Sequence, residues 1–410
     1  MRHSEAEVLA LDAADPLAQC REAFLLPEGV IYLDGNSLGP LTRAARQRVS
    51  ETVAAEWGHG LIRSWNTAGW IDLPAIVGSK IAPLIGASPG TVTVTDSTSV
   101  NLFKVLATAL AKRPDRRVIV TETGNFPTDL YVAQGLARLL AQGHEIRQVE
   151  AAALPAAIDE TVAVILLTEV NYRTGTRLEM AALTARAHAA GALTIWDLAH
   201  SAGAFPVELG VAEADFAIGY GYKYLNGGPG APAFVYVAPR HIDGLRQPLN
   251  GWMGHAAPFD FGPDYEPAPS IEAMRVGTPP ILGLAALDAA LSAFEGVDLA
   301  AVKAKADRLF EIFTGEIAAL CPELELLTPA DPAHRGTQAS LRFADAYPVM
   351  QALIARGVIG DFRQPDILRF GLTPLYLRHI DVRNAAHVLG GIMRGRLWDR
   401  PEFHRRAKVV

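Results

Sequence analysis

Short apolar runs alternate with helical stretches between about residues 90 and 240, and this alternation constrains the fold more than any other feature. The apolar runs predict strands at 92–95, 117–121, 162–167, 193–197, 215–219 and 233–237, and the stretches between them predict helices at 100–111, 129–142 and 181–190. Runs that are apolar throughout suit strands covered on both faces, which is typical of a mostly parallel α/β sheet. Ligands of such sheets bind at the carboxyl ends of the strands.

The remainder of the chain predicts a second, smaller unit. Residues 247–280 are rich in Pro, Gly and aromatic residues without a clear period, which indicates a functional loop or a linker. The later pattern predicts two helices over 282–320, strands at 323–327, 339–343, 358–362 and 367–372, and helices near 347–356 and 381–394. We therefore expect a large ligand-binding domain at 61–285 and a small α+β domain at 286–410, with which the mostly helical residues 1–60 pack.

Composition excludes several classes of protein. Half of the 410 residues are hydrophobic and 20% are charged, as in ordinary soluble globular proteins. The formal charge of −7 gives no basic field for nucleic acid, and no apolar run approaches the roughly 18 residues of a membrane span. The first residues contain acids and no apolar segment of a secretory signal, and Cys20 and Cys321 are too few for a disulfide framework or a zinc site. We therefore expect a cytoplasmic protein.

Lys223 is the strongest candidate for a reactive group. It follows the strand at 215–219 within the segment Gly-Tyr-Gly-Tyr-Lys-Tyr, and aromatic neighbours hydrate an amine poorly. Poor hydration lowers the pKa of a lysine, and its neutral amine can form a Schiff base with an aldehyde. Asp197, which ends the strand at 193–197, could keep a pyridine nitrogen protonated, and this combination is what pyridoxal phosphate (PLP) requires. The alternative is a lysine whose stem lies along the strand end with its amine in water.

A phosphate signal lies in the segment Thr95-Asp-Ser-Thr-Ser-Val-Asn, between a predicted strand and a predicted helix. Clustered hydroxyl groups and free backbone N–H groups at a helix N-terminus bind phosphate, because that end carries partial positive charge. The alternative is ordinary capping of the helix by Asp96 or Ser97. The nearby Schiff-base lysine favours the phosphate interpretation.

Two further groups follow predicted strands. In the turn Asn125-Phe-Pro-Thr-Asp, Phe126 could stack on an aromatic ring and Asp129 could accept from a phenolic hydroxyl, although a plain turn with a helix cap would look the same. His200 stands three residues after Asp197, and a third metal ligand at a suitable spacing is missing from the sequence. We therefore expect His200 to orient Asp197 or a cofactor oxygen.

The segment Gly35-Asn-Ser-Leu-Gly matches the nucleophile elbow of α/β hydrolases. Only 34 residues precede it, too few for the strands that a hydrolase sheet needs before its nucleophile. The match is therefore treated as a coincidence of a short motif.

With these residues in place, nearly the whole chain resembles kynureninase. The segments that carry the resemblance are Tyr32-Leu-Asp-Gly-Asn-Ser-Leu-Gly-Pro, Arg63-Ser-Trp, Phe126-Pro-Thr-Asp, Asp197-Leu-Ala-His-Ser, Gly221-Tyr-Lys-Tyr-Leu-Asn-Gly-Gly, Gly251-Trp-Met-Gly-His and Arg275-Val-Gly-Thr-Pro-Pro. The resemblance implies a PLP enzyme of the aspartate-aminotransferase fold (fold type I), with a mostly parallel seven-stranded sheet and a smaller α+β domain. It implies a homodimer that cleaves L-kynurenine hydrolytically to anthranilate and L-alanine in tryptophan degradation.

The resemblance also implies roles for individual residues. Lys223 would hold PLP as a Schiff base, with Asp197 on the pyridine nitrogen. Further cofactor contacts would come from Thr98, Ser99, Phe126, Asp129, Thr168, His200 and Tyr222. Trp252 and Thr278 would reach the cofactor of the neighbouring subunit. The substrate would be bound by Asn36, Trp65, Thr278 and Arg369, of which Arg369 grips the α-carboxylate.

Two residues bear on the choice of substrate. The resemblance implies that relatives favouring 3-hydroxykynurenine carry His at the position of Trp65 and Asn at that of Thr278, so this chain resembles the bacterial, kynurenine-preferring type. The alternative for Trp65 is a core or interface residue. In the implied chemistry Lys223 removes the Cα proton, Asp197 keeps the ring protonated, and Tyr222 is the candidate general acid and base for cleavage.

Other functions remain as alternatives at this point. An aminotransferase or a cysteine desulfurase of the same fold is the nearest one. A desulfurase needs a cysteine on a mobile loop, and neither Cys20 in the N-terminal arm nor Cys321 between a predicted helix and strand suits that role. A non-enzymatic PLP-binding protein is the third possibility.

Overall fold

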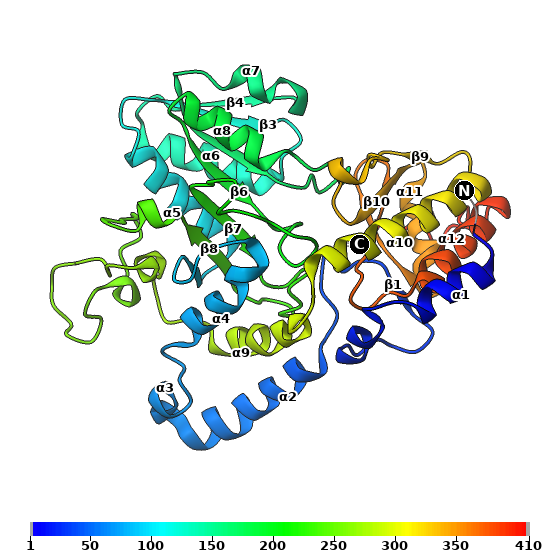
Figure 1. The fold of residues 1–410 in the computed structure, drawn as a ribbon, viewed down its shortest axis with the longest axis horizontal. Coiled ribbons are helices and arrows are strands. Elements are labelled where there is room, and N and C mark those ends of the chain that lie inside the picture. Colours follow the sequence, from blue (N-terminus) through cyan, green and yellow to red (C-terminus); the bar gives the residue numbers. More distant parts are fainter. Residues whose placement is uncertain (1–2, 407–410) are drawn as a thin grey trace.

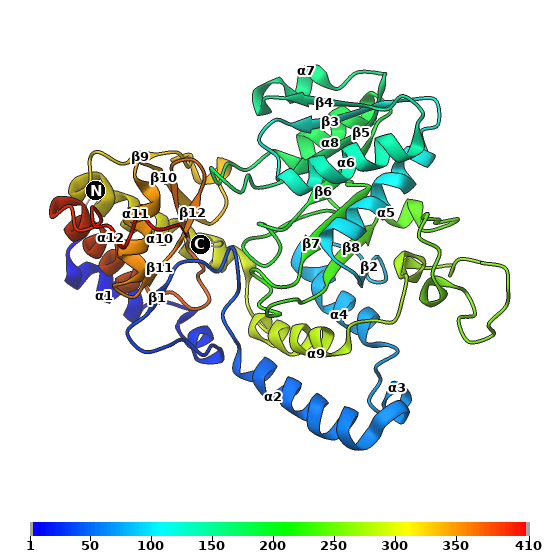
Figure 2. The ribbon, with the colours of Figure 1, turned by 180° about the vertical axis from the view of Figure 1, so that it is seen from behind.

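The computed structural model describes residues 3–406 of the chain. Figure 1 shows a larger part built on one sheet and a smaller part that contains α1 and α12, near the two ends of the described chain, with helix α2 projecting beneath them. The same arrangement is seen from behind in Figure 2. Within the described residues, no helix combines the length and the apolar character that a membrane crossing needs.

The larger part contains a seven-stranded sheet. Its strands, in spatial order, are β2 (Val92–Val94), β8 (Ala233–Val237), β7 (Phe216–Tyr220), β6 (Leu193–Asp197), β5 (Val162–Thr168), β3 (Val118–Glu122) and β4 (Glu145–Val149). Only β8 runs against the others, because it pairs antiparallel with both β2 and β7 while the remaining pairs are parallel. This confirms the predicted mostly parallel α/β sheet. The edge strand β4 was not predicted.

Helices cover both faces of this sheet, as the apolar strands require. Along β5, Val164 and Leu166 belong to the apolar cluster on one face, whereas Ile165 and Leu167 belong to the cluster on the other. Residues of α5 (Thr98–Ala111) and α6 (Pro127–Leu140) cover the first face. Residues of α4 (Leu73–Ile81), α8 (Met180–Ala189) and α9 (Ile281–Ala290) cover the second. The short helix α7 (Leu154–Ala157) packs near β3 and α8.

The smaller part is an α+β unit. Its antiparallel sheet has the order β12 (Asp361–Arg363), β13 (Ile367–Gly371), β10 (Gln338–Arg342) and β9 (Glu325–Leu326). It is covered by α10 (Leu299–Leu320) and α11 (Ala346–Ile354), and α12 (His379–Arg394) packs on both of these helices.

The strand predicted at 358–362 is divided in the structure, and this part of the prediction is wrong. Strand β11 (Val358–Ile359) pairs in parallel with β1 (Ile31–Tyr32), and β12 pairs with β13. Gly360 stands at the change of partner, where an added Cβ would lie 2.9 Å from the carbonyl oxygen of Arg369. The backbones approach too closely there for a side chain.

The N-terminal segment contacts both parts. Helix α1 (Glu5–Ala13) packs on α12 of the smaller part. Helix α2 (Arg43–Glu51) packs on α9 of the larger part and continues as a π-helix over Thr52–Gly60. A short turn leads from it to α3 (Ser64–Thr67). The segment from α2 to α3 is called the arm below.

Candidate active site

The carboxyl ends of the parallel strands bring most of the predicted residues into one cavity. Thr168 ends β5, Asp197 ends β6, and Lys223 follows the last residue of β7 by three positions. The cavity is lined by Thr98, Ser99, Phe126, Thr128, Asp129, Thr168, Tyr172, Asp197, Ala199, His200, Tyr220, Tyr222 and Lys223. Thr128, Tyr172, Ala199 and Tyr220 were not predicted. Tyr172 stands four residues beyond the end of β5, so inspection of every strand end would have found it.

The amine of Lys223 lies in a setting that favours its neutral form. Burial lowers the pKa of Lys223 from 10.5 to about 8, and the neighbouring carboxylate of Asp197 opposes part of that effect. Its Nζ lies 3.1 Å from Nε2 of His200 and 6.0 Å from the centre of the Phe126 ring. Burial, with the charge of Lys223, also holds the pKa of His200 well below its usual value, so the imidazole is neutral and can accept from the ammonium.

Two buried carboxyl groups face this amine. Burial raises the pKa of Asp197, and the charge of Lys223 opposes part of that rise. The Oδ1 of Asp197 accepts a hydrogen bond of 2.7 Å from the backbone N–H of Ala199. Burial and the charge of Asp197 raise the pKa of Asp129 well above its usual value. The hydroxyl of Thr168 contacts Oδ2 of Asp129 at 3.4 Å. A cationic group between the two acids would relieve their mutual repulsion.

The cavity fits PLP by the chemistry of its lining. The hydroxyl of Thr98 and Nδ1 of His200 are buried and lack a hydrogen-bond partner among residues 3–406. Thr98 begins α5, so its hydroxyl lies beside the free N–H groups of a helix that is 14 residues long. Phe126 adds a flat ring for stacking and Asp197 an acid for the pyridine nitrogen. Thr98 and the N-terminus of α5 would hold the phosphate of the cofactor, Phe126 would hold its ring, and Asp197 would hold its ring nitrogen.

Arg369 lies beside the cavity within a buried ionic cluster. Its Nε donates to Oδ1 of Asp361 at 2.8 Å, and its Nη2 donates to the second oxygen of the same carboxylate and to Oγ of Ser37. The Nη1 donates to the carbonyl oxygen of Tyr172 at 2.7 Å. The ring of Tyr172 packs edge-on against Phe126 at 5.1 Å, so Tyr172 connects Arg369 with the cavity wall.

The segment that contains Asn36 packs against this cluster. Burial and the charge of Asp361 raise the pKa of Asp34 to about 7. Asn36 is fully buried, and within the described part of the chain its carboxamide has no hydrogen-bond partner. A Cβ at Gly371 would lie 2.3 Å from Oδ1 of Asn36, so only glycine allows this close approach. The backbone N–H of Gly39 donates to the carbonyl oxygen of Tyr222 at 2.8 Å, which joins this segment to the residue before Lys223.

Trp65, Trp252 and Thr278 do not line the Lys223 cavity of the same chain, although Thr278 lines an adjoining pocket with Tyr220 and Ser97. The three residues line a second hollow together with Ile62, Asn66, Ile71, Met253 and Phe259. This hollow lies between the arm and the loop that precedes α9. The predicted site residues therefore form two groups in one chain.

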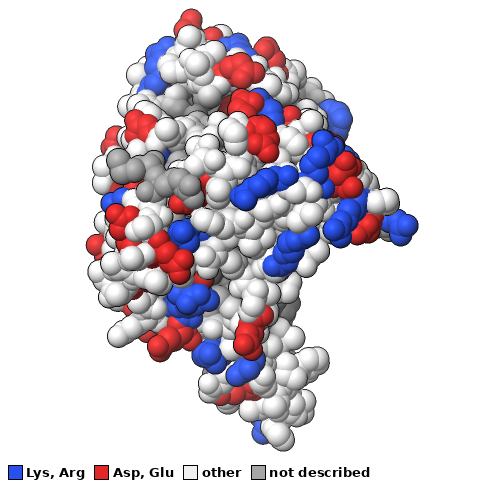
Figure 3. Space-filling view, turned by 90° about the vertical axis from the view of Figure 1, so that its right-hand side faces the viewer, with Lys and Arg blue, Asp and Glu red and all other residues white. Residues whose placement is uncertain are grey.

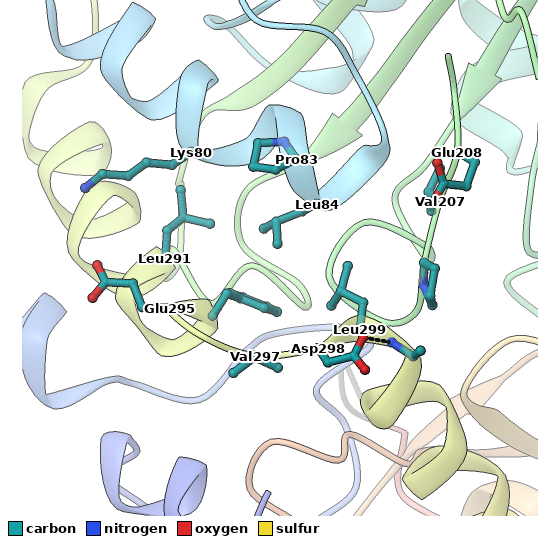
Figure 4. Close-up of a pocket in the computed structure, with 13 residues that line it drawn as sticks. Lys80, Pro83, Leu84, Val207, Glu208, Leu291, Glu295, Val297, Asp298 and Leu299 are labelled. Carbon is teal, nitrogen blue, oxygen red and sulfur yellow. Dashed lines mark hydrogen bonds between the residues drawn. The ribbon is translucent and has the colours of Figure 1, made fainter. Parts of the chain in front are cut away.

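A further groove of about 680 Å³ opens between α4, the loop around Glu208 and the connection from α9 to α10 (Figure 4). Leu84, Leu291 and Phe294 form much of its wall. Of its charged groups, Lys80 is paired with Asp288 at 2.7 Å. None of the residues predicted from the sequence lines this groove, so we place the chemistry in the Lys223 cavity.

Fold and cavity together define a PLP-dependent enzyme of fold type I. Solved structures with this fold include the cysteine desulfurase CsdA from Escherichia coli, with a TM-score of 0.77 and 20% identity over 93% of this chain and 98% of that one. A C-DES variant with glycine covalently linked to its PLP cofactor has a TM-score of 0.77 and 18% identity, over 88% of this chain and 97% of that one. At such low identity, these likenesses show the fold alone.

The sequence comparisons identify the family. Residues 302–389 match the family model for the kynureninase C-terminal domain. A curated relative named kynureninase from Burkholderia pseudomallei (strain 1106a) is 52% identical over 411 residues, which cover 98% of this chain and 99% of the relative. The chain belongs to the kynureninase family.

Proposed function

We propose that this protein uses PLP and water to cleave the Cβ–Cγ bond of L-kynurenine, which gives anthranilate and L-alanine. The observation that carries the proposal is the cavity that joins Lys223, Asp197 and the N-terminus of α5, in a chain 52% identical to a kynureninase. When bound, PLP supplies an electron sink for the negative charge that develops at the substrate Cα. We also propose a cytoplasmic role in tryptophan degradation, with NAD synthesis as a further destination of the pathway.

Lys223 and Asp197 carry the proton chemistry at the cofactor. Because its pKa is lowered to about 8, roughly a tenth of the free Lys223 amine is neutral at pH 7, far more than for an ordinary lysine, and this form can take the proton from Cα. Asp197 would keep a proton on the pyridine nitrogen through a charge-assisted hydrogen bond. Phe126 would stack on the ring, and Asp129 and Thr168 would face its phenolic oxygen. Thr98, Ser99 and Tyr222 would hold the phosphate.

Arg369 orients the substrate and Tyr222 serves the cleavage step. The guanidinium of Arg369 binds the α-carboxylate, and its bonds to Asp361, Ser37 and Tyr172 hold the plane of the group fixed. Burial and Tyr220 raise the pKa of Tyr222, so its phenol is protonated at pH 7. It is therefore suited to donate a proton first and to accept one later.

We further propose that the active form is a homodimer with shared sites. The arm exposes large apolar side chains, with Trp57 57% and Ile62 77% accessible, and most of its surface is uncharged in Figure 3. The loop around Trp252 exposes Phe259 and Phe261 at 57% and 76%. An exposed apolar surface of this extent is typical of a protein–protein interface. In the dimer, Trp252 and Thr278 would complete the cavity of the partner subunit.

Complementation tests the shared site. Lys223→Ala and Trp252→Ala should each be inactive as homodimers, and mixing the two should restore activity because one of the two cavities then has both residues. Sedimentation verifies the state of each sample. A monomer that keeps full turnover at high dilution would contradict the proposal.

Turnover of L-kynurenine tests the function itself. The purified protein with PLP should produce anthranilate, followed by its fluorescence, and L-alanine in equal amounts. Formation of a 2-oxo acid instead would indicate an aminotransferase. Release of sulfide from cysteine would indicate a desulfurase, although Cys321 is buried at the C-terminal end of α10 and Cys20 lies in the N-terminal segment. No product from any of these amino acids would favour a non-enzymatic PLP-binding protein.

A further inference from the structure

Lys104 is a buried cation that the proposed chemistry does not use. It lies in the second turn of α5 and none of its side chain is exposed. Its Nζ lies 2.7 Å from Oδ2 of Asp96 and donates to the carbonyl oxygen of Met274 at 2.5 Å. Burial lowers the pKa of Lys104, and the carboxylate of Asp96 counteracts this by favouring the charged form.

The acid partner of Lys104 stands at the start of the phosphate end of the cavity. Asp96 precedes Ser97, which caps α5, and Thr98, whose buried hydroxyl faces no partner among the residues described. Asp96 has a backbone φ of 52°, in the left-handed region that favours glycine. This backbone is held by the N–H of Ala233, which donates to the carbonyl oxygen of Asp96 at 3.0 Å, and by the bond from Lys104.

The position of Asp96 creates an electrostatic problem for an anionic ligand. A phosphate at the N-terminus of α5 carries close to two negative charges, and the carboxylate of Asp96 lies two residues before Thr98. Like charges at this separation repel when the site is shielded from water. The ammonium of Lys104 offsets the carboxylate from the side away from solvent. Its bond to Met274 also anchors α5 to the segment that leads to Thr278.

We propose that Lys104 is a positioning residue for the cofactor phosphate. Lys104 neutralises the carboxylate of Asp96 and fixes the turn that precedes α5. The inference deepens the proposed function, because it rests on PLP binding with its phosphate at Thr98 and Ser99. It concerns affinity for the phosphate group rather than turnover.

The test compares PLP with pyridoxal, which has the same ring and aldehyde but no phosphate. For Lys104→Met, the dissociation constant of PLP, from an absorbance titration of the protein stripped of cofactor, should rise at least about tenfold. The dissociation constant of pyridoxal should change little. An unchanged ratio of the two constants would overturn the inference. Failure of the wild-type protein to bind either ligand at Lys223 would contradict the proposed function instead, since both ligands need that amine.

Lys305→Met is the matched control. Lys305 is also buried, and its Nζ contacts Oδ2 of Asp15 at 2.7 Å and the carbonyl oxygen of Pro374 at 2.6 Å. Its removal costs the same kind of ion pair and backbone contact in the smaller part of the molecule. We expect reduced thermal stability with an unchanged ratio of PLP to pyridoxal affinity. If Lys305→Met changed the ratio of PLP to pyridoxal affinity as much as Lys104→Met does, general destabilisation would explain the effect of both variants, and the inference would be overturned.

A second substitution separates charge neutralisation from simple packing. In Lys104→Met the carboxylate of Asp96 is left unpaired, so adding Asp96→Asn should recover most of the lost PLP affinity. Failure of the double variant to recover it would overturn the proposed mechanism. If Lys104→Met does not fold, Asp96→Asn alone carries the test. Its PLP affinity should stay equal or rise relative to pyridoxal, and a fall would contradict the inference.

Discussion

Replacing Arg369 by Lys should weaken substrate binding far more than it weakens the fold. Arg369 is 1% exposed and donates to both oxygens of Asp361, to Ser37 and to the carbonyl oxygen of Tyr172. Leucine at this position would leave the buried carboxylate of Asp361 with Arg363 as its remaining cation, at a cost of up to about 3–5 kcal/mol of stability. Lysine keeps the positive charge but cannot reproduce the planar fork. Arg369→Lys therefore separates recognition of the carboxylate from folding.

The magnitude follows from the bonds that are lost. Four of the five N–H groups of Arg369 donate within the protein, so one N–H of Nη1 is left for the substrate carboxylate. Loss of this charge-assisted hydrogen bond removes about 1.5–3 kcal/mol. This corresponds to a rise in KM of roughly 10- to 150-fold for L-kynurenine. The value of kcat should also fall, because the bonds from Asp361 and Tyr172 no longer fix the orientation of the group.

The assay is steady-state formation of anthranilate at a range of L-kynurenine concentrations, with thermal unfolding measured in parallel. Arg335→Lys is the matched control, because Arg335 is also 1% exposed, pairs with Asp307 at 3.0 Å and lies over the ring of Phe310. Within residues 3–406 it has no hydrogen bond to a residue that lines the cavity, whereas Arg369 bonds to Tyr172, so substitution of Arg335 should lower stability without changing KM. An unchanged KM in Arg369→Lys would mean that another residue binds the carboxylate.

Three further predictions follow from the cavity. Without PLP, the pKa of Lys223 is about 8 in the fold against 10.5 for the ordinary amine, so the folded state loses this proton first. Between pH 8 and 10.5 the free energy of unfolding of the wild type should therefore rise by about 2–3 kcal/mol relative to that of Lys223→Met. A difference between the two proteins that does not change with pH would refute the lowered pKa of Lys223. Asp197→Ala should keep bound PLP but lose most of its turnover; near-full kcat would remove Asp197 from the mechanism. The wild type should prefer L-kynurenine to 3-hydroxykynurenine by about 5- to 150-fold, since an unpaired buried hydroxyl costs 1–3 kcal/mol. Trp65→His with Thr278→Asn should reduce that preference, and equal kcat/KM ratios in the two proteins would exclude these residues from specificity.

The parallel sheet could be predicted because its inner strands are apolar on both faces. Val162–Thr168 is buried at every position, so its sequence is apolar almost throughout. The edge strand Glu145–Val149 has only one neighbouring strand and is exposed at two positions, so it retains Glu, Arg and Gln and lacks an apolar run. Its place in the sheet follows from pairing with β3, which is a property of the fold and not of the segment.

The same distinction applies to the candidate site. Lys223 and Asp197 could be predicted from local sequence, because each follows a buried strand and the ends of parallel strands meet at one edge. The pairing of Arg369 with Asp361 depends on the register of two antiparallel strands, in which these residues stand opposite each other. The separation of Trp252 from the cavity depends on the path of an irregular loop, and that path has no periodic pattern in the sequence.

Hydrolysis of L-kynurenine in water enriched in oxygen-18 tests the central claim most directly. If water adds to the side-chain ketone before the Cβ–Cγ bond breaks, mass spectrometry should find the label in the carboxylate of anthranilate. The L-alanine formed in equal amount should carry none. Unlabelled anthranilate, or consumption of L-kynurenine to a 2-oxo acid without anthranilate, would contradict hydrolytic cleavage at this site.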